Sequence, residues 1–179
     1  DISEIDEKKG YVYFMASPTN ATQKYLYRTR LDGTGNAERV SPLTQEGTHD
    51  YNLSPGAKFA RHNFSNYYTK PVDEWVSMPD HKGIDGKNVV DEAIAAADKK
   101  NSNISFFKIT TSEGVEMDAW MVKPANFDPQ KKYPVVFYVY TEPWGQNVVD
   151  RYGASNNFLY KGDMQQDGYI YISIDNRGT

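Results

Sequence analysis

Residues 131–146 read KKYPVVFYVYTEPWGQ, and their centre, residues 135–140, is an unbroken run of apolar and aromatic side chains. A strand with one solvated face alternates apolar and polar residues, whereas a strand covered on both faces does not. We therefore predict a strand buried on both faces, as in a parallel sheet. Pro134 bounds it on one side, and the turn residues 143–145 bound it on the other.

The segments around this run predict an α/β sheet. A second apolar run, YIYISI, occupies residues 169–174, and residues 156–166 between the two runs predict a helix. A helical crossover joining two parallel strands is normally right-handed. Upstream, residues 104–109 and 115–122 predict a β-hairpin around the turn TSEG at 111–114.

The first part of the chain has a different pattern. Turn residues separate short β-prone segments at 10–16, 24–31, 58–65 and 72–78, which is typical of propeller blades or of a sandwich. Residues 89–99 are rich in alanine, with acidic residues early, and predict a helix. The predicted fold class is therefore mixed β and α/β: a β segment over residues 1–80, a linker with a helix over 81–103, and an α/β part over 104–179.

Composition excludes several classes of protein. The net charge is −4 and charges of both signs are interspersed, so no basic stripe for nucleic acid is present. No apolar run reaches the roughly 18 residues of a membrane span. The absence of cysteine excludes disulfides and a thiolate nucleophile. The first residues, DISEIDE, lack the features of a signal peptide, and we expect the chain to be a piece of a longer protein.

Several motifs resemble the dipeptidyl peptidase IV family of prolyl-oligopeptidase-like serine peptidases. Residues 131–146 are similar to the family's Lys-Tyr-Pro entry into the third hydrolase strand, which ends in Tyr and two small residues before a Pro. The segments MVKPANFD at 121–128 and SIDNRGT at 173–179 resemble its flanking motifs. Residues 10–65, with YVYF, YLYR and NLSPGAK, resemble its last propeller blades.

The resemblance implies an incomplete protein fold: terminal β-propeller strands followed by the first strands of an α/β-hydrolase domain. It implies a serine exopeptidase that releases N-terminal dipeptides with Pro or Ala at the penultimate position. Such enzymes carry a Gly-x-Ser-x-Gly nucleophile motif, then Asp and His. The chain has no such motif, and its three histidines precede the α/β part, so we expect the triad outside the chain and this piece to be inactive alone.

Tyr140 is the one catalytic residue that the resemblance carries over. It implies that the Tyr140 hydroxyl donates a hydrogen bond to the oxyanion of the tetrahedral intermediate, as a neutral phenol can at pH 7. In a departure from the family's pattern, Thr141 and Glu142 occupy the positions of its two small residues, and a carboxylate there would oppose the developing negative charge.

The other candidate residues favour structural roles. A loop tryptophan such as Trp144 is more often a packing anchor, and we expect Glu142 to be a solvated charge. For Asp175 and Arg177 we predict an ion pair or loop hydrogen bonds near a strand end. We expect Glu113 and Glu116 to be surface charges on the hairpin. The scattered histidines lack a spaced carboxylate partner, so we predict no metal site; they are His49, His62 and His81.

Two further classes of function stay open. One is a non-catalytic β-propeller module that binds peptide or glycan, and the other is a different α/β-hydrolase such as an esterase or acylaminoacyl peptidase. The resemblance implies peptide substrates, no cofactor and a periplasmic or extracellular location. Strands taken from a larger sheet expose unpaired edges, so we expect a homodimer or association through those edges.

Overall fold

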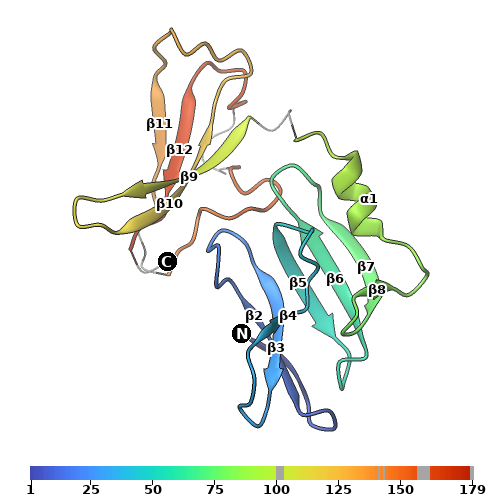
Figure 1. Ribbon diagram of the computed structural model, residues 1–179. Helices are drawn as coiled ribbons and strands as arrows, with labels where there is room; N and C mark the ends of the chain where they lie inside the picture. Colours follow the sequence, from blue (N-terminus) through green and yellow to red (C-terminus); the bar gives the residue numbers. More distant parts are fainter. Residues whose placement is uncertain (100–102, 141, 143, 157–161, 178–179) are drawn as a thin grey trace. The chain divides into compact units, whose positions relative to one another are not determined.

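The computed structural model in Figure 1 describes residues 1–99, 103–140, 142, 144–156 and 162–177. Within these residues the chain forms twelve strands and one α-helix, so the protein is rich in sheet. It divides into a first unit, Asp1–Asp98 with Asp150–Tyr152, and a second unit, Lys99–Val149 with Gly153–Thr179. Each unit has its own sheet structure and its own hydrophobic core.

The first sheet of the first unit is antiparallel and its strands follow chain order. It consists of β1 (Ile2–Asp6), β2 (Tyr11–Ala16), β3 (Tyr25–Arg30) and β4 (Glu38–Arg39). Gly10 precedes β2 with a φ of 73°, a left-handed conformation that glycine adopts without a Cβ clash. The strands predicted at 10–16 and 24–31 are confirmed as β2 and β3.

The second sheet of the first unit repeats this arrangement. It consists of β5 (Thr48–Leu53), β6 (Phe59–Ser65), β7 (Val72–Ser77) and β8 (Lys82–Gly83), again antiparallel and in chain order. Four antiparallel strands in sequence are the content of one propeller blade. The strands predicted at 58–65 and 72–78 are confirmed as β6 and β7.

The core of the first unit joins the two sheets. Side chains from β2 and β3 pack with side chains from β6, β7 and the turns beside them, and this cluster contains Tyr13, Met15, Leu26, Ala57, Ala60, Val76 and Met78. Strand residues alternate between the two faces of a sheet, so Tyr13 and Met15, two positions apart on β2, both enter the core. Helix α1 (Val89–Ala96) packs against β7 with Val90 fully buried, which confirms the predicted helix.

The second unit contains one mixed sheet, with the strand order β11-β12-β10-β9 (Figure 1). Strands β9 (Ile104–Thr110) and β10 (Glu116–Val122) form the predicted antiparallel hairpin. Strand β12 (Ile170–Ile174) pairs antiparallel with β10 and parallel with β11 (Val135–Tyr138). The two apolar runs are therefore neighbours in a parallel pair, as predicted. Trp120, Val122, Val148 and Tyr171 form the core of this unit.

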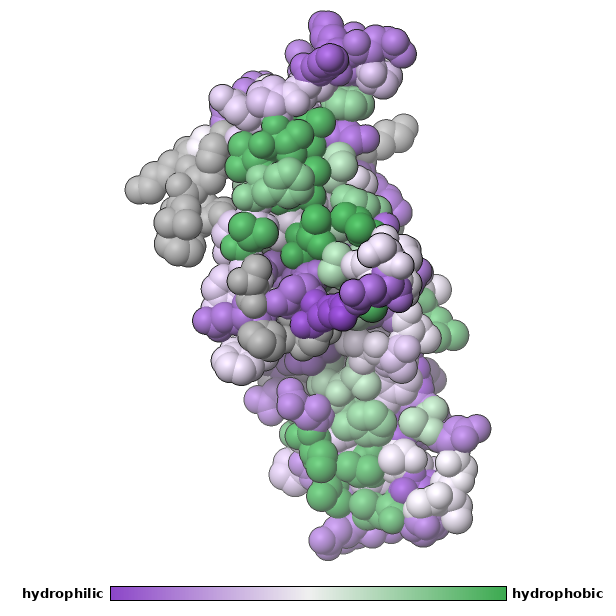
Figure 2. All heavy atoms as spheres, turned by 90° about the vertical axis from the view of Figure 1, so that its left-hand side faces the viewer, coloured by the Kyte–Doolittle hydropathy of each residue, from purple (hydrophilic) through white to green (hydrophobic). Residues whose placement is uncertain are grey.

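The predicted burial of residues 135–140 on both faces is wrong for this chain. Phe137 is 58% exposed and Val139 is 66% exposed. Strand β11 lies at the edge of the sheet, and no element in the described ranges covers it, so its apolar side chains meet solvent. Figure 2 views the molecule from the left-hand side of Figure 1, and hydrophobic side chains gather on the face that it shows.

The helix predicted at 156–166 is not found in the part of that segment that the structure describes. Residues 164–166 form a turn, and residues 157–161 lie outside the described residues, as do residues 100–102 of the predicted linker. In the described part of the chain, no helix combines the length and the apolar character needed to cross a membrane.

Candidate functional site

Tyr140 lies in the second unit, two residues beyond the end of β11. Its side chain is 43% exposed and does not enter the core. The ring lies against Gly145 so closely that a Cβ added to this glycine would collide with it. The Asn147 side-chain amide donates a hydrogen bond of 3.4 Å to the Tyr140 carbonyl oxygen. The phenol therefore stands beyond the carboxyl end of a parallel strand, with access to solvent.

Glu142 controls the electrostatics of Tyr140. A hydrogen bond with the Glu142 side chain, followed by the charge of that carboxylate, raises the pKa of the Tyr140 hydroxyl. The raised pKa keeps the phenol protonated, as a hydrogen-bond donor must be. The same hydrogen bond directs the proton to a carboxylate, so Glu142 competes with any other acceptor. Glu142 is exposed, as expected of a loop charge, and Thr141 lies outside the described residues.

Trp144 does not anchor the loop by packing. Its side chain is 81% exposed, so the predicted packing role is wrong for this chain. A tryptophan side chain packed in a core loses most of its contact with water, whereas the Trp144 side chain retains most of its contact with water. The exposed indole lies one residue before Gly145, the glycine that contacts Tyr140.

Asp175 holds the loop that follows Tyr140. It is buried just beyond the end of β12, and its carboxylate accepts hydrogen bonds from the backbone N–H groups of Asn147, at 2.7 Å, and Val148, at 3.1 Å. Burial raises the pKa of the Asp175 carboxyl, and the two backbone hydrogen bonds oppose this rise. The predicted loop hydrogen bonds are confirmed for Asp175.

Arg177 is paired with a residue of the β9–β10 hairpin. Its guanidinium forms an ion pair with Glu113, and both side chains are exposed. Glu116, on β10, forms a second exposed ion pair with Lys108 on β9, at 3.0 Å. These contacts confirm the ion pair predicted for Arg177 and the surface positions of both glutamates.

A second group of functional side chains lies inside the first unit, and sequence reasoning missed it. This histidine cluster consists of Tyr51 and Glu74 with the three histidines His49, His62 and His81. The ladder of the second sheet pairs Tyr51 with His62 and His62 with Glu74, so the three side chains form one row across β5, β6 and β7. The prediction that the histidines are scattered, without a carboxylate partner, is therefore wrong.

Hydrogen bonds connect the histidine cluster from end to end. The His49 ring lies 2.8 Å from the Gln45 carbonyl oxygen through Nε2 and 2.9 Å from His62 Nε2 through Nδ1. His62 Nδ1 lies 2.8 Å from a Glu74 carboxylate oxygen. Because the carbonyl oxygen only accepts, His49 carries its proton on Nε2, and His62 Nε2–H donates to His49 Nδ1.

Burial sets the charge states in the histidine cluster. It lowers the pKa of His49 well below the usual value and that of His81 to about 4, and in both cases the charge of His62 adds to the effect. Burial alone would raise the pKa of Glu74, but the hydrogen bond and charge of His62 outweigh it and the pKa is lowered. His49 and His81 are therefore neutral at pH 7, while Glu74 is a carboxylate.

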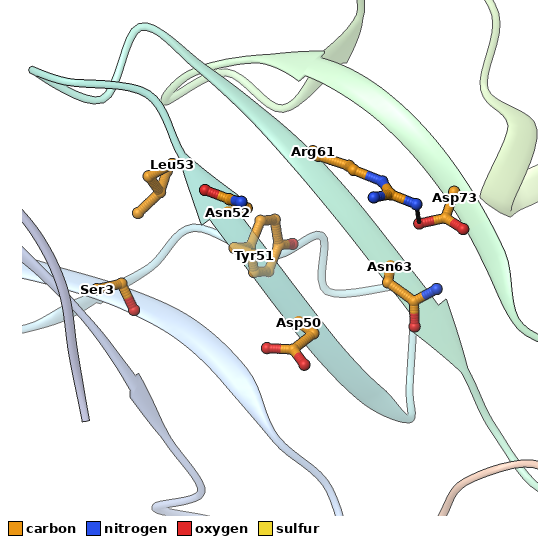
Figure 3. A pocket seen from close by; sticks show the side chains of 8 residues that line it. All are labelled: Ser3, Asp50, Tyr51, Asn52, Leu53, Arg61, Asn63 and Asp73. Carbon is orange, nitrogen blue, oxygen red and sulfur yellow. Dashed lines mark ion pairs between the residues drawn. The ribbon is translucent and has the colours of Figure 1, made fainter.

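A polar pocket opens on the first unit, as Figure 3 shows. Its volume is about 550 Å³, and it is lined by Ser3, Asp50, Tyr51, Asn52, Leu53, Arg61, Asn63 and Asp73. Arg61 forms an ion pair of 3.2 Å with Asp73 across β6 and β7, so its charge is compensated. The lining contains a serine but no histidine and therefore no nucleophile–base pair.

Comparison with known proteins gives consistent matches. Residues 1–71 match the family described as the dipeptidyl peptidase IV N-terminal region. The chain is 30% identical over 99% of its length to a probable dipeptidyl-aminopeptidase B of Penicillium rubens, and 29% identical, also over 99%, to one of Botryotinia fuckeliana. It covers 19% of each of these relatives, so it spans about a fifth of their length.

A solved structure matches the whole chain. The crystal structure of Porphyromonas gingivalis dipeptidyl peptidase 4 superimposes with a TM-score of 0.75 and 25% sequence identity. The match covers 100% of this chain and 24% of that protein.

Proposed function

We propose that the chain is a piece of a dipeptidyl peptidase IV family protein, a serine exopeptidase that releases dipeptides from the N-termini of peptides, after Pro or Ala. Its sheet-rich first unit matches a piece of the family's N-terminal β-propeller. The nucleophile, its aspartate and its histidine belong to other parts of the whole protein, and this piece is inactive alone. A periplasmic or extracellular location is part of the same proposal.

The second unit opens the α/β-hydrolase domain in this proposal. An antiparallel hairpin, β9 and β10, is followed by the parallel pair β11 and β12, and ligand-binding groups of α/β sheets gather beyond the carboxyl ends of such strands. In the whole protein, further elements cover the exposed side chains of β11. Without them, the exposed edge of β11 supports association between copies of this chain.

The single observation that carries the proposal is the place of Tyr140. Its phenol stands beyond the carboxyl end of β11, protonated and accessible. A rigid neutral donor at this point acts on the charge that develops on a scissile carbonyl oxygen, whereas it contributes little to the uncharged ground state. Asp175 supports this role by fixing the backbone of Asn147, whose amide binds the Tyr140 carbonyl.

The test uses the full-length protein with two chromogenic substrates, one with a free Gly-Pro N-terminus and one N-acylated. We expect hydrolysis of the free substrate, and Tyr140→Phe should lower kcat on the order of 10²–10³-fold with little change in KM. Tyr152→Phe, at an equally exposed tyrosine of the first unit, is the matched control. Cleavage of only the acylated substrate would identify an acylaminoacyl peptidase and contradict the dipeptidyl assignment.

The hydrogen bond between Tyr140 and Glu142 favours a second candidate, a non-catalytic module that binds peptide or glycan. In such a protein the Tyr140 hydroxyl does not have to donate to an oxyanion. The Glu142 carboxylate beside it would therefore not impair function. A full-length protein that binds peptides but hydrolyses neither substrate, with Tyr140→Phe unchanged in affinity, would support this reading over the enzyme.

A further inference from the structure

We propose that His62, Glu74 and His81 form a binding site for a divalent transition-metal ion of the zinc type, inside the first unit. Each residue offers one ligand atom, a ring nitrogen or a carboxylate oxygen, and these atoms all lie within 4.8 Å of one another. His62 and Glu74 are buried and His81 is partly buried, so the site is largely shielded from bulk water.

The backbone brings the three ligands together from separate elements. His62 on β6 is the ladder partner of Glu74 on β7, on the face of the sheet that points inward. His81 comes from the turn between β7 and β8, where it has a φ of 52°. A left-handed backbone at a non-glycine residue costs free energy and persists where the surroundings hold it. This conformation places the His81 ring edge-on to His62, with ring centroids 4.8 Å apart.

Two imidazoles and one carboxylate are a donor set that suits Zn²⁺. Tetrahedral zinc binds nitrogen and oxygen ligands at about 2.0–2.2 Å, which places the ligand atoms about 3.3 Å from one another. His62 Nδ1 and a Glu74 carboxylate oxygen are 2.8 Å apart, so this pair of ligand atoms must separate by only about 0.5 Å to hold the ion. Three protein ligands leave a fourth position for water.

The ion takes the place of a hydrogen bond. His62 Nδ1 and a Glu74 carboxylate oxygen face each other at 2.8 Å, and a metal at this point binds both atoms in place of their contact. His81 Nε2 lies 2.8 Å from the Tyr51 hydroxyl, which has Ser41 Oγ as an alternative partner at 3.2 Å. Tyr51 therefore keeps a hydrogen bond if His81 turns to the metal.

An outer layer of hydrogen bonds already orients His62 for this role. Its Nε2–H is held by His49, and His49 is held by the Gln45 carbonyl. A metal-binding histidine usually has its second ring nitrogen fixed in this way, which sets the tautomer and the ring plane.

The experiment measures Zn²⁺ and Co²⁺ binding to the full-length protein after treatment with a chelator, by calorimetry and by the visible absorption of four-coordinate Co²⁺. We expect one ion per chain at this site. Glu74→Gln and His81→Asn should each weaken affinity by at least about 100-fold, the upper range for losing a supporting residue. Asparagine also tolerates the left-handed backbone at position 81.

Asp73→Asn is the matched control for Glu74→Gln, because Asp73 is the neighbouring carboxylate on β7 and faces the opposite side of the sheet. It should leave the affinity within about twofold, as expected of a residue outside the site. The absence of a stoichiometric ion in the wild-type protein would overturn the proposal, whatever the variants do. Equal affinity in the wild type, Glu74→Gln and His81→Asn would also overturn it, because the ion would then bind elsewhere.

Discussion

Glu142, two residues beyond Tyr140 in the same loop, raises the pKa of the Tyr140 hydroxyl through hydrogen bonding and the charge of its carboxylate. The carboxylate favours the protonated phenol and at the same time competes for its proton. For an oxyanion donor the first effect is useful, while the second must be overcome when the substrate arrives. Glu142 is therefore the residue that distinguishes this site from one with two small residues after the tyrosine.

Glu142→Gln should lower the pKa of Tyr140 towards the ordinary value near 10. The carboxylate favours the protonated phenol, so its removal lets the phenolate appear at lower pH. A difference titration of phenolate absorbance against Tyr140→Phe isolates this tyrosine from the others. An unchanged titration in Glu142→Gln would show that the carboxylate does not reach the hydroxyl.

The same variant should change catalysis in the full-length enzyme. The neutral glutamine carbonyl is a weaker acceptor than the carboxylate, so the Tyr140 hydroxyl donates more readily to the oxyanion, and the developing charge is no longer repelled. We expect kcat to rise by about 3–10-fold, a modest change because the site is exposed to solvent. Steady-state kinetics would contradict this if kcat fell in Glu142→Gln while Tyr140→Phe remained strongly impaired.

Asp175→Ala should destabilise the protein by about 1–3 kcal/mol, because the backbone N–H groups of Asn147 and Val148 lose their acceptor inside the second unit. Glu116→Ala is the control, since it removes only an exposed ion pair with Lys108, worth about 0–1 kcal/mol. Denaturant titrations of both variants give the comparison. Equal losses in the two would mean that the loop does not depend on Asp175.

Leu26→Ala should cost about 2–5 kcal/mol, because Leu26 is fully buried in the core that joins the two sheets of the first unit. Leu31 lies just past the end of the same strand and is 48% exposed, so Leu31→Ala should stay within about 0.5 kcal/mol. Thermal unfolding distinguishes the two. A small effect of Leu26→Ala would indicate that the sheets do not share a core.

Glu74→Ala should cost about 1–3 kcal/mol in the metal-free protein, because the buried His62 ring loses the hydrogen-bond partner of its Nδ1. Asp73→Ala removes an exposed carboxylate paired with Arg61 and should change stability by less than about 1 kcal/mol. Unfolding in the presence of a chelator separates this effect from metal binding. Equal losses of unfolding free energy in Glu74→Ala and Asp73→Ala would show that the buried His62–Glu74 contact stabilises the protein no more than the exposed ion pair does.

Much of the local structure follows from sequence pattern. Turn residues and β-prone runs located β2, β3, β6, β7 and the β9–β10 hairpin, and the alanine-rich segment located α1. These elements depend on neighbours in the chain: period-two alternation, turn residues and helix propensity act over a few residues. The loop hydrogen bonds of Asp175 were also foreseen, because a carboxylate next to a strand end has backbone N–H groups within reach.

The sequence pattern did not determine which side chains are buried or which distant segments come into contact. Residues 135–140 read as a strand covered on both faces, yet within this chain β11 is an edge strand with its side chains exposed. Trp144 was expected to pack and instead meets solvent. An apolar run predicts that its side chains are buried. It does not identify the segments that bury them, because those segments lie elsewhere in the sequence.

The sequence by itself determined where strands and the first helix form, and its motifs pointed to the family and to Tyr140. Only the tertiary structure decided that His62, Glu74 and His81 meet, since they come from two strands and a turn separated by up to 19 residues of chain. Strand register places residues opposite one another to within a single position, and a shift of one residue would turn His62 away from Glu74. That register is fixed by the packing of whole sheets, which no local motif encodes.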